Sequence, residues 1–165
     1  MDALTNIYNR YGFDTLAERM IAKNPRNHYI AALLDVDNFK LINDVYGHAY
    51  GDRTLKNLAD SMKKFFPSDV LLGRNGGDEF CVILYNCPYE MAERKIRKIQ
   101  KEFSSGQTKE YPKSFSCGIV EVEGGNEELQ VRDIIKQADH EMYLQKKEHK
   151  KKYRKELSVI SISED

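Results

Sequence analysis

The sequence predicts an α+β fold of the βαββαβ type, in which helices flank a mostly antiparallel sheet, as in ferredoxin-like and polymerase-palm domains. Apolar runs typical of strands alternate with segments of helical spacing along the chain. Two of these runs are separated only by the turn around Gly76-Gly77, which is typical of a hairpin and leaves no room for a parallel crossover. A chain of 165 residues without an internal repeat suits one domain with its own core.

The N-terminal part predicts a helix, a strand and a second helix. Asp2 is placed to cap a helix whose apolar positions recur at helical spacing as far as Ile21, and Pro25 follows its end. Residues 29–37 are apolar until the run ends in acids, which is typical of a central strand buried on both faces. Asp37 is placed to cap the short helix that follows.

A polar loop and the hairpin form the middle of the chain. Residues 43–52 hold two glycines and open a longer helix, which stops at Pro67. The hairpin then joins apolar runs at 70–72 and 80–84. Two acids at the turn, Asp78 and Glu79, are neighbours on the chain and therefore point to opposite faces of a strand.

The last third predicts a helix, a strand and a final helix. Pro88 starts the first of these, residues 115–122 form the strand, and residues 124–126 form a turn. The final helix has apolar positions from 131 to 143. The basic run 146–155 that follows is interpreted as a solvated helix end rather than a nucleic-acid arm.

Composition narrows the class of protein. The net charge is zero, which argues against nucleic acid and anionic membranes as partners, and no apolar run is long enough to span a bilayer. Cys81 and Cys117 lie in apolar runs, so we expect buried, reduced thiols and a cytoplasmic domain. We interpret residues 1–150 as one domain and 151–165 as a basic tail. Because the chain opens on a helix start, we expect a domain cut from a longer protein, which could be membrane-attached.

Acidic side chains converge in the predicted sheet. Asp35 ends the first strand, which lies beside the hairpin in a βαββαβ sheet, so it comes close to Asp78 and Glu79. Carboxylates that converge repel one another and need a cation or a proton. Mg²⁺ binds a few carboxylates and fills its other positions with water and phosphate oxygens. The sequence therefore predicts a metal-dependent phosphate site with Asp35 and Asp78 as first-choice ligands, while Glu79 is balanced between ligand or base and surface acid.

Groups suited to a nucleotide lie nearby. Phe39 and Lys40 follow a helix start, and Lys146 on the last helix can reach the same end of the sheet, although single lysines are more often solvated. Asn43 and Asp52 offer an amide and a carboxylate that match the hydrogen-bonding edge of guanine. Taken alone this pair is a weak signal, since polar loop residues usually make turns.

Five ordered blocks of the chain together carry a resemblance: Asp2-Ala3-Leu4-Thr5 with Asn9-Arg10; Asp35-Val36-Asp37-Asn38-Phe39-Lys40; Asn43-Asp44 with Tyr46-Gly47-His48 and Gly51-Asp52; Gly76-Gly77-Asp78-Glu79-Phe80; and Ser116-Cys117-Gly118 with Ala138-Asp139, Tyr143 and Lys146. With them the chain resembles the GGDEF domain family, the bacterial diguanylate cyclases, from residue 2 to about residue 150. The resemblance implies a five-stranded, palm-like sheet related to nucleotide cyclases. It also implies the condensation of two GTP into cyclic di-GMP with release of two pyrophosphates. A homodimer would bring the two GTP together, with an upstream sensor or dimerisation domain outside this chain.

The resemblance implies a metal site and a catalytic group. Asp35 and Asp78 would bind Mg²⁺ or Mn²⁺ with the backbone carbonyl of Val36. Glu79 would be a further ligand or the base that helps to deprotonate the attacking 3′-hydroxyl. Lys40 would complete the catalytic group with Asp78 and Glu79.

The resemblance also implies the nucleotide contacts. Phe39, through its backbone, would hold the β- and γ-phosphates together with Lys40 and Lys146, and Gly76 and Gly77 would let the nucleotide lie across the hairpin.

The guanine would be read by Asn43 and Asp52, with His48 on the ribose side. Retention of Asp52 favours GTP over mixed purine products. Lys150 stands where the family usually has an arginine, and it lacks the bidentate fork that would grip the triphosphate more tightly. The family's product-inhibition motif needs an arginine three residues before Asp69, which this chain lacks, so we expect no such inhibition.

Three functional hypotheses follow. The first is an active diguanylate cyclase, a metal-dependent nucleotidyltransferase. The second is a non-catalytic domain that binds GTP and signals through a partner domain, and the third is a plain dimerisation module. Relatives of the second kind usually lose a signature acid or glycine, whereas all are present here, so the resemblance favours the first.

Overall fold

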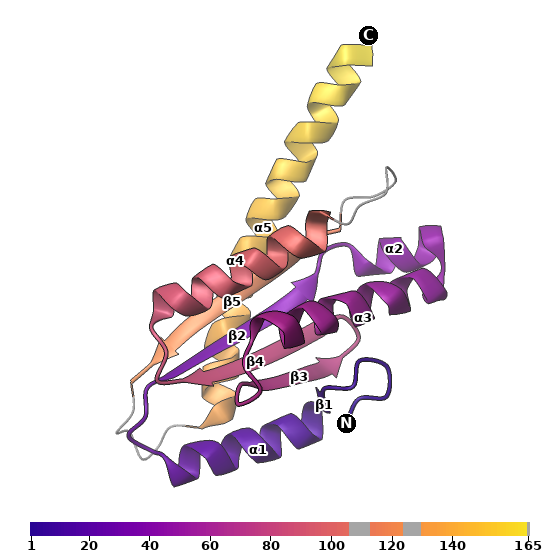
Figure 1. The fold of residues 1–165 in the computed structure, drawn as a ribbon. Helices are drawn as coiled ribbons and strands as arrows, with labels where there is room; N and C mark the ends of the chain where they lie inside the picture. The colour runs from indigo at the N-terminus through magenta and orange to yellow at the C-terminus, as the bar shows by residue number, and fades with distance from the viewer. Residues whose placement is uncertain (106–112, 124–129, 165) are drawn as a thin grey trace.

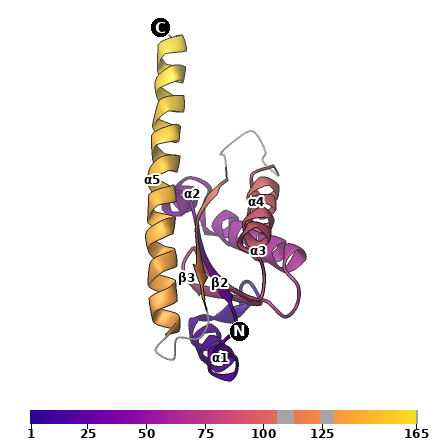
Figure 2. The same ribbon diagram turned by 90° about the vertical axis from the view of Figure 1, so that its left-hand side faces the viewer.

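The computed structural model describes residues 1–105, 113–123 and 130–164. Its elements are β1 (Tyr8–Asn9), α1 (Arg10–Lys23), β2 (Tyr29–Val36), α2 (Phe39–Tyr46), α3 (His48–Phe65), β3 (Leu71–Gly76), β4 (Glu79–Tyr85), α4 (Tyr89–Ser105), β5 (Phe115–Val122) and α5 (Val131–Glu164). They form three layers, with the sheet between α1 and α5 on one face and α3 and α4 on the other (Figure 1, Figure 2).

The sheet has five strands in the order β1-β3-β4-β2-β5. Every neighbouring pair is antiparallel except β1 and β3, which are parallel. The α+β, palm-like fold class predicted from the sequence is therefore confirmed. The fifth strand, β1, is not found from apolar periodicity because two residues are too few to show a period.

Alternation along β2 divides the core into two layers. All eight residues of β2 are buried. Its even-numbered residues pack with α3 and α4, and its odd-numbered apolar residues pack with α1 and α5. Asp35 is odd-numbered, so its side chain lies on the face that α5 covers.

The N-terminal segment differs from the expectation that Asp2 caps a helix. The Asp2 carboxylate accepts hydrogen bonds from the backbone and the hydroxyl of Thr5, and it forms an ion pair with Arg74 on β3. The helix begins later, where the side chain of Asn9 accepts a hydrogen bond from the Gly12 N–H. Asp2 therefore fastens the N-terminal turn to the hairpin instead.

The expectation that Asp37 caps a helix is also wrong. Its carboxylate accepts hydrogen bonds from the hydroxyls of Ser114 and Ser116 at 2.7 and 2.6 Å, and it pairs with Nδ1 of His149 at 2.9 Å. The residue before α2 is Asn38, whose side chain makes no capping hydrogen bond. The Asp37 carboxylate thus binds side chains from β5, the residue before it and α5, and is not used to cap α2.

Helix α5 is the longest element and crosses the sheet close to β5. A Cβ added at Gly118 would lie 1.9 Å from the carbonyl oxygen of Ala138, so this contact requires glycine. The helix continues past the sheet through the basic run to Glu164 (Figure 1).

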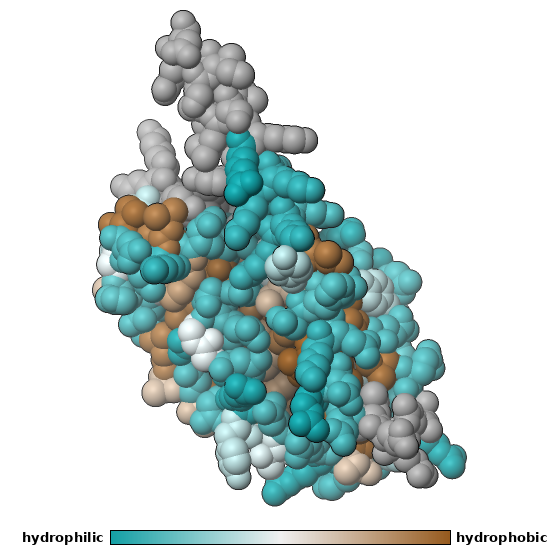
Figure 3. All heavy atoms as spheres, turned by 180° about the vertical axis from the view of Figure 1, so that it is seen from behind, coloured by the Kyte–Doolittle hydropathy of each residue, from teal (hydrophilic) through white to brown (hydrophobic). Residues whose placement is uncertain are grey.

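The face opposite to the view of Figure 1 is mostly hydrophilic, and hydrophilic side chains interrupt its hydrophobic patches (Figure 3). None of the described helices combines the length and the apolar character needed to cross a bilayer. The turn expected at residues 124–126 lies outside the described residues.

Candidate functional site

The end of β2 and the hairpin turn bring the predicted acids together. Asp35 is the register partner of Glu79 on β4, so their side chains share the face that α5 covers. Asp78 lies in the turn, and its carbonyl oxygen accepts a hydrogen bond from the N–H of Val36 at 3.3 Å. The turn is thereby fastened to the end of β2. Asp35, Val36, Asp78 and Glu79 form one group of neighbours.

Asp35 is a buried acid whose pKa is shifted in opposite directions by Asp78 and Lys146. Burial raises the pKa of Asp35 to about 7; the neighbouring carboxyl of Asp78 contributes to the rise and Lys146 opposes it. Burial on its own would lower the pKa of Lys146, but its hydrogen bond to Asp35 outweighs this and the pKa is raised. Lys146 is therefore a charged ammonium group, and the Asp35 carboxyl beside it takes up a proton near neutral pH.

One oxygen of Asp35 suits a cation. Lys146 donates to Oδ2, whereas Oδ1 is buried without a hydrogen-bond partner among the described residues. A buried carboxylate oxygen left in this way costs free energy unless a donor or cation reaches it. The donor set of Asp35, Asp78 and Glu79 offers only hard oxygen ligands, which Mg²⁺ and Mn²⁺ accept. The residues present therefore fit a divalent ion.

The hairpin turn is open above its two glycines. Gly76 and Gly77 have φ angles of +117° and +53°, and nothing lies within 4 Å of a Cβ added at either. Nε of Arg74 donates to the carbonyl oxygen of Gly77 at 2.8 Å, while its guanidinium pairs with Asp2. This arginine brace was not expected from the sequence. A ligand can approach the backbone of this turn closely, because no side chain covers the two glycines and Arg74 holds the turn in place.

A second orphaned acceptor lies between α2 and α3. Oδ1 of Asn43 is buried and has no partner among the described residues. A Cβ added at Gly51 would lie 1.9 Å from this oxygen and 3.3 Å from the ring of Phe39. The amide of Asn43 thus occupies the space on α3 that a side chain at Gly51 would fill. Asp52 and His48 are exposed on the first turns of α3, next to it in sequence.

The predicted phosphate-binding lysines are not all brought together. Lys146 reaches Asp35, whereas Lys40 and Lys150 are exposed and form no hydrogen bond or ion pair within the described residues. Lys40 lies in the first turn of α2, which begins three residues after Val36. Both lysines are therefore free to reach a ligand at this end of the sheet.

A cavity of about 360 Å³ opens where the acids face α5. It is lined by Asp35, Glu79, Lys136, Asp139, His140, Met142, Tyr143 and Lys146. Lys136 and His140 were missed because the sequence places them on a helix face that resembles an ordinary solvated one. The sequence gave no local signal for His149, Ser114 and Ser116, which bind the carboxylate of Asp37.

The chain is similar in sequence to known proteins over almost its whole length. The family model "Diguanylate cyclase, GGDEF domain" matches residues 1–152. The chain is 36% identical to diguanylate cyclase DgcP of Escherichia coli (strain K12) over 157 residues, which is 92% of this chain and 45% of DgcP. It is 33% identical to the cyclic di-GMP phosphodiesterase PdeR of the same strain over 150 residues, which is 88% of this chain and 22% of PdeR. The chain thus spans less than half the length of these relatives.

A solved structure has the same fold. The GGDEF domain of DgcB from Caulobacter crescentus, solved in complex with c-di-GMP, matches with a TM-score of 0.82 at 27% sequence identity. The match covers 89% of this chain and 90% of that one. The sheet and its helices are therefore arranged as in that domain.

Proposed function

The chain belongs to the GGDEF domain family of diguanylate cyclases, and from this premise we propose that it condenses two GTP into cyclic di-GMP with release of two pyrophosphates. The observation that carries the proposal is the buried Oδ1 of Asp35, which has no partner among the described residues and lies beside Asp78 and the open glycine turn. A cation-binding oxygen next to an open turn is what a nucleotidyltransferase of this kind needs.

The metal-binding part of the proposal rests on the end of β2. Asp35, Asp78 and the backbone carbonyl of Val36 would hold Mg²⁺ or Mn²⁺, with Glu79 as a further ligand or as the base for the 3′-hydroxyl. When bound, the ion would neutralise charge on the triphosphate and polarise the attacked phosphorus. Lys146, which pairs with Oδ2 of Asp35, would also be within reach of a phosphate oxygen of the bound nucleotide.

The nucleotide-binding part rests on α2 and α3. Asn43 and Asp52 would hydrogen-bond the guanine, with His48 on the ribose side. The N-terminal backbone of α2 at Phe39 would donate to phosphate oxygens, since a helix start carries free N–H groups.

The remaining phosphate contacts come from Lys40, Lys146 and Lys150. The open turn at Gly76 and Gly77 would leave room for the nucleotide. The proposal places the domain in the cytoplasm, because that compartment contains GTP.

Catalysis would need two copies of the domain. One site holds one GTP, so the 3′-hydroxyl of one nucleotide has to meet the α-phosphate of the other across a homodimer. The alternative is a domain that binds GTP and regulates a partner domain; the relative PdeR, which is named a phosphodiesterase and not a cyclase, keeps this alternative in view.

A turnover assay tests the proposal. The chain is fused to a dimeric coiled coil, incubated with GTP and Mg²⁺, and the products are separated by chromatography. We expect cyclic di-GMP and two pyrophosphates for each product molecule. GTP binding without pyrophosphate release would contradict the cyclase and favour the regulatory alternative.

A substitution at Gly51 tests the guanine contact. In Gly51→Ala the new Cβ would displace the amide of Asn43, and we expect GTP affinity to fall on the order of tenfold, because one hydrogen bond to the base is lost. The free energy of unfolding should stay the same or rise by up to about 1 kcal/mol, since alanine is the better helix former. Isothermal titration and urea unfolding measure the two quantities.

Asn43→Ala is the matched control for this prediction. It removes the same amide directly, so the double variant should bind GTP no more weakly than either single variant. Wild-type affinity in Gly51→Ala would contradict the assignment of Asn43 to guanine.

A further inference from the structure

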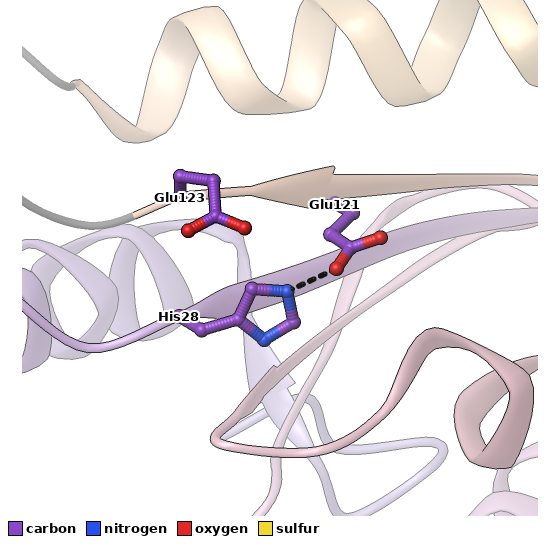
Figure 4. Close-up of side chains that lie close together, drawn as sticks. All are labelled: His28, Glu121 and Glu123. Carbon is purple, nitrogen blue, oxygen red and sulfur yellow. Dashed lines mark hydrogen bonds and ion pairs between the residues drawn. The ribbon is translucent and has the colours of Figure 1, made fainter.

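Three metal-ligating side chains meet at the end of the sheet opposite to the catalytic acids: His28, Glu121 and Glu123 (Figure 4). His28 immediately precedes β2, Glu121 lies near the end of β5, and Glu123 follows that strand. Asp35 is seven residues along from His28, which corresponds to roughly 20 Å of extended chain. The cluster is therefore separate from the proposed nucleotide site.

The strand register explains why these side chains converge. Ile30 is the partner of Glu121 and Tyr29 is the partner of Val122, so one further step places His28 opposite Glu123. Directly opposed residues of an antiparallel pair point to the same face, as do residues two apart on one strand. All three side chains therefore project from the face that α4 covers, whereas Asp35 projects from the other.

The backbone of His28 is held in place on its other side by β4. The Asn86 N–H donates to the carbonyl oxygen of His28 at 2.8 Å, and the His28 N–H donates to Oδ1 of Asn86 at 3.4 Å. The imidazole thus projects from a backbone that Asn86, the residue after β4, holds by two hydrogen bonds, and such support preorganises a metal ligand.

The distances suit one bound ion. Nε2 of His28 lies 2.6 Å from an oxygen of Glu121, and one ligand atom from each of the three residues lies within 4.8 Å of the others. Ligands about 2.1 Å from a zinc ion are roughly 3 to 4 Å apart in tetrahedral geometry. Small rotations of the two exposed glutamates would close the site without movement of the strands.

The charge of the cluster also calls for a cation. Glu121 pairs with His28, but Glu123 forms no hydrogen bond or ion pair in the described part of the chain. The two carboxylates of the cluster carry a formal charge of −2, which a divalent ion would neutralise. An imidazole nitrogen in the donor set favours zinc and its neighbours over Mg²⁺ and Ca²⁺, which take oxygen ligands.

We propose that His28, Glu121 and Glu123 bind a divalent transition-metal ion of the Zn²⁺ type with three protein ligands and one position open to water. The ion bridges the ends of β2 and β5, so it stabilises the central strand that carries Asp35 at its other end. This site is independent of the proposed cyclase activity.

The test is a Zn²⁺ titration of the whole chain without nucleotide, in competition with a chromophoric chelator. It is repeated in an Asp35→Asn background, so that the nucleotide site does not contribute. We expect one equivalent of Zn²⁺ that survives the background substitution, and a melting temperature that rises with Zn²⁺. Excess Mg²⁺ should not displace it. Co²⁺ in its place should show d–d absorption without a thiolate charge-transfer band.

Variants decide whether these three residues are the ligands. His28→Ala and Glu123→Gln should each weaken Zn²⁺ binding at least tenfold, whereas the control His140→Ala on α5 should leave it unchanged. Glu123→Gln is exposed and isosteric, so it keeps the fold intact if His28→Ala does not. Absence of Zn²⁺ binding, or wild-type affinity in either ligand variant, would overturn the proposal.

Discussion

Replacing Asp78 with alanine is expected to abolish cyclic di-GMP formation. The side chain would take with it one of the proposed metal ligands and the carboxylate that lies beside Asp35. Loss of electrostatic stabilisation at a reacting phosphate lowers turnover on the order of 10²-fold or more. Asp78 lies partly exposed in a turn, so the fold should be preserved. Pyrophosphate release from the dimerised protein measures the rate, and circular dichroism checks the fold.

The matched control for this prediction is Asp60→Ala. Asp60 is an exposed acid near the end of α3, away from the hairpin, so its removal should leave the rate unchanged. A second variant, Asp78→Asn, retains the size of the side chain and should be as inactive as alanine if the charge is what matters. Full activity in Asp78→Ala would show that the ligand assignment is wrong.

Gly118→Ala should cause the largest loss of stability. The added Cβ would lie 1.9 Å from the carbonyl oxygen of Ala138 and 2.4 Å from the N–H nitrogen of Met142, so β5 and α5 would have to separate. Backbone atoms cannot rotate away as a side chain can, and we expect a loss of about 3 kcal/mol in the free energy of unfolding. Urea unfolding followed by circular dichroism measures it.

Gly12→Ala provides the comparison. A Cβ there would meet the side chains of Asn9 and Tyr8 at 3.3 and 3.4 Å, so small side-chain shifts suffice. We expect a change within about 1 kcal/mol. Equal stability in the two alanine variants would contradict the close approach of α5 to the sheet. Because α5 carries Lys146, partial separation in Gly118→Ala should also reduce GTP binding.

Much of the fold could be predicted because its signals are local. A continuous apolar run identified the strand that became β2, and adjacent glycines between two apolar runs identified the hairpin of β3 and β4. Strand β1 was missed, since two residues have no period. The start of the first helix was also misplaced, because Asp2 has the chemistry of a cap but binds Arg74 instead.

Less of the candidate site could be predicted, because its contacts are long-range. The ion pair between Lys146 and Asp35 joins residues 111 positions apart, and His149 reaches Asp37 over 112 positions. The spacing of apolar residues along the chain carries no information about such a contact. The ion pair between Arg74 and Asp2, which are 72 positions apart, and the cavity against α5 have the same long-range origin. The sequence-based interpretation of Asp37 was wrong because it considered only the neighbouring helix.

The sequence by itself determined which residue types were available and in what order. The alternation of strands and helices, the glycine turn and the acids at the ends of strands all follow from side-chain chemistry and spacing along the chain. The tertiary structure alone decided which acids meet and which acceptors remain unsatisfied. It left one oxygen of Asp35 and one of Asn43 buried without a partner among the described residues. It also gathered His28, Glu121 and Glu123 on the other face of the sheet. The physical reason is that strand pairing and the packing of α5 join segments far apart in sequence, and burial then determines what each polar group can bind.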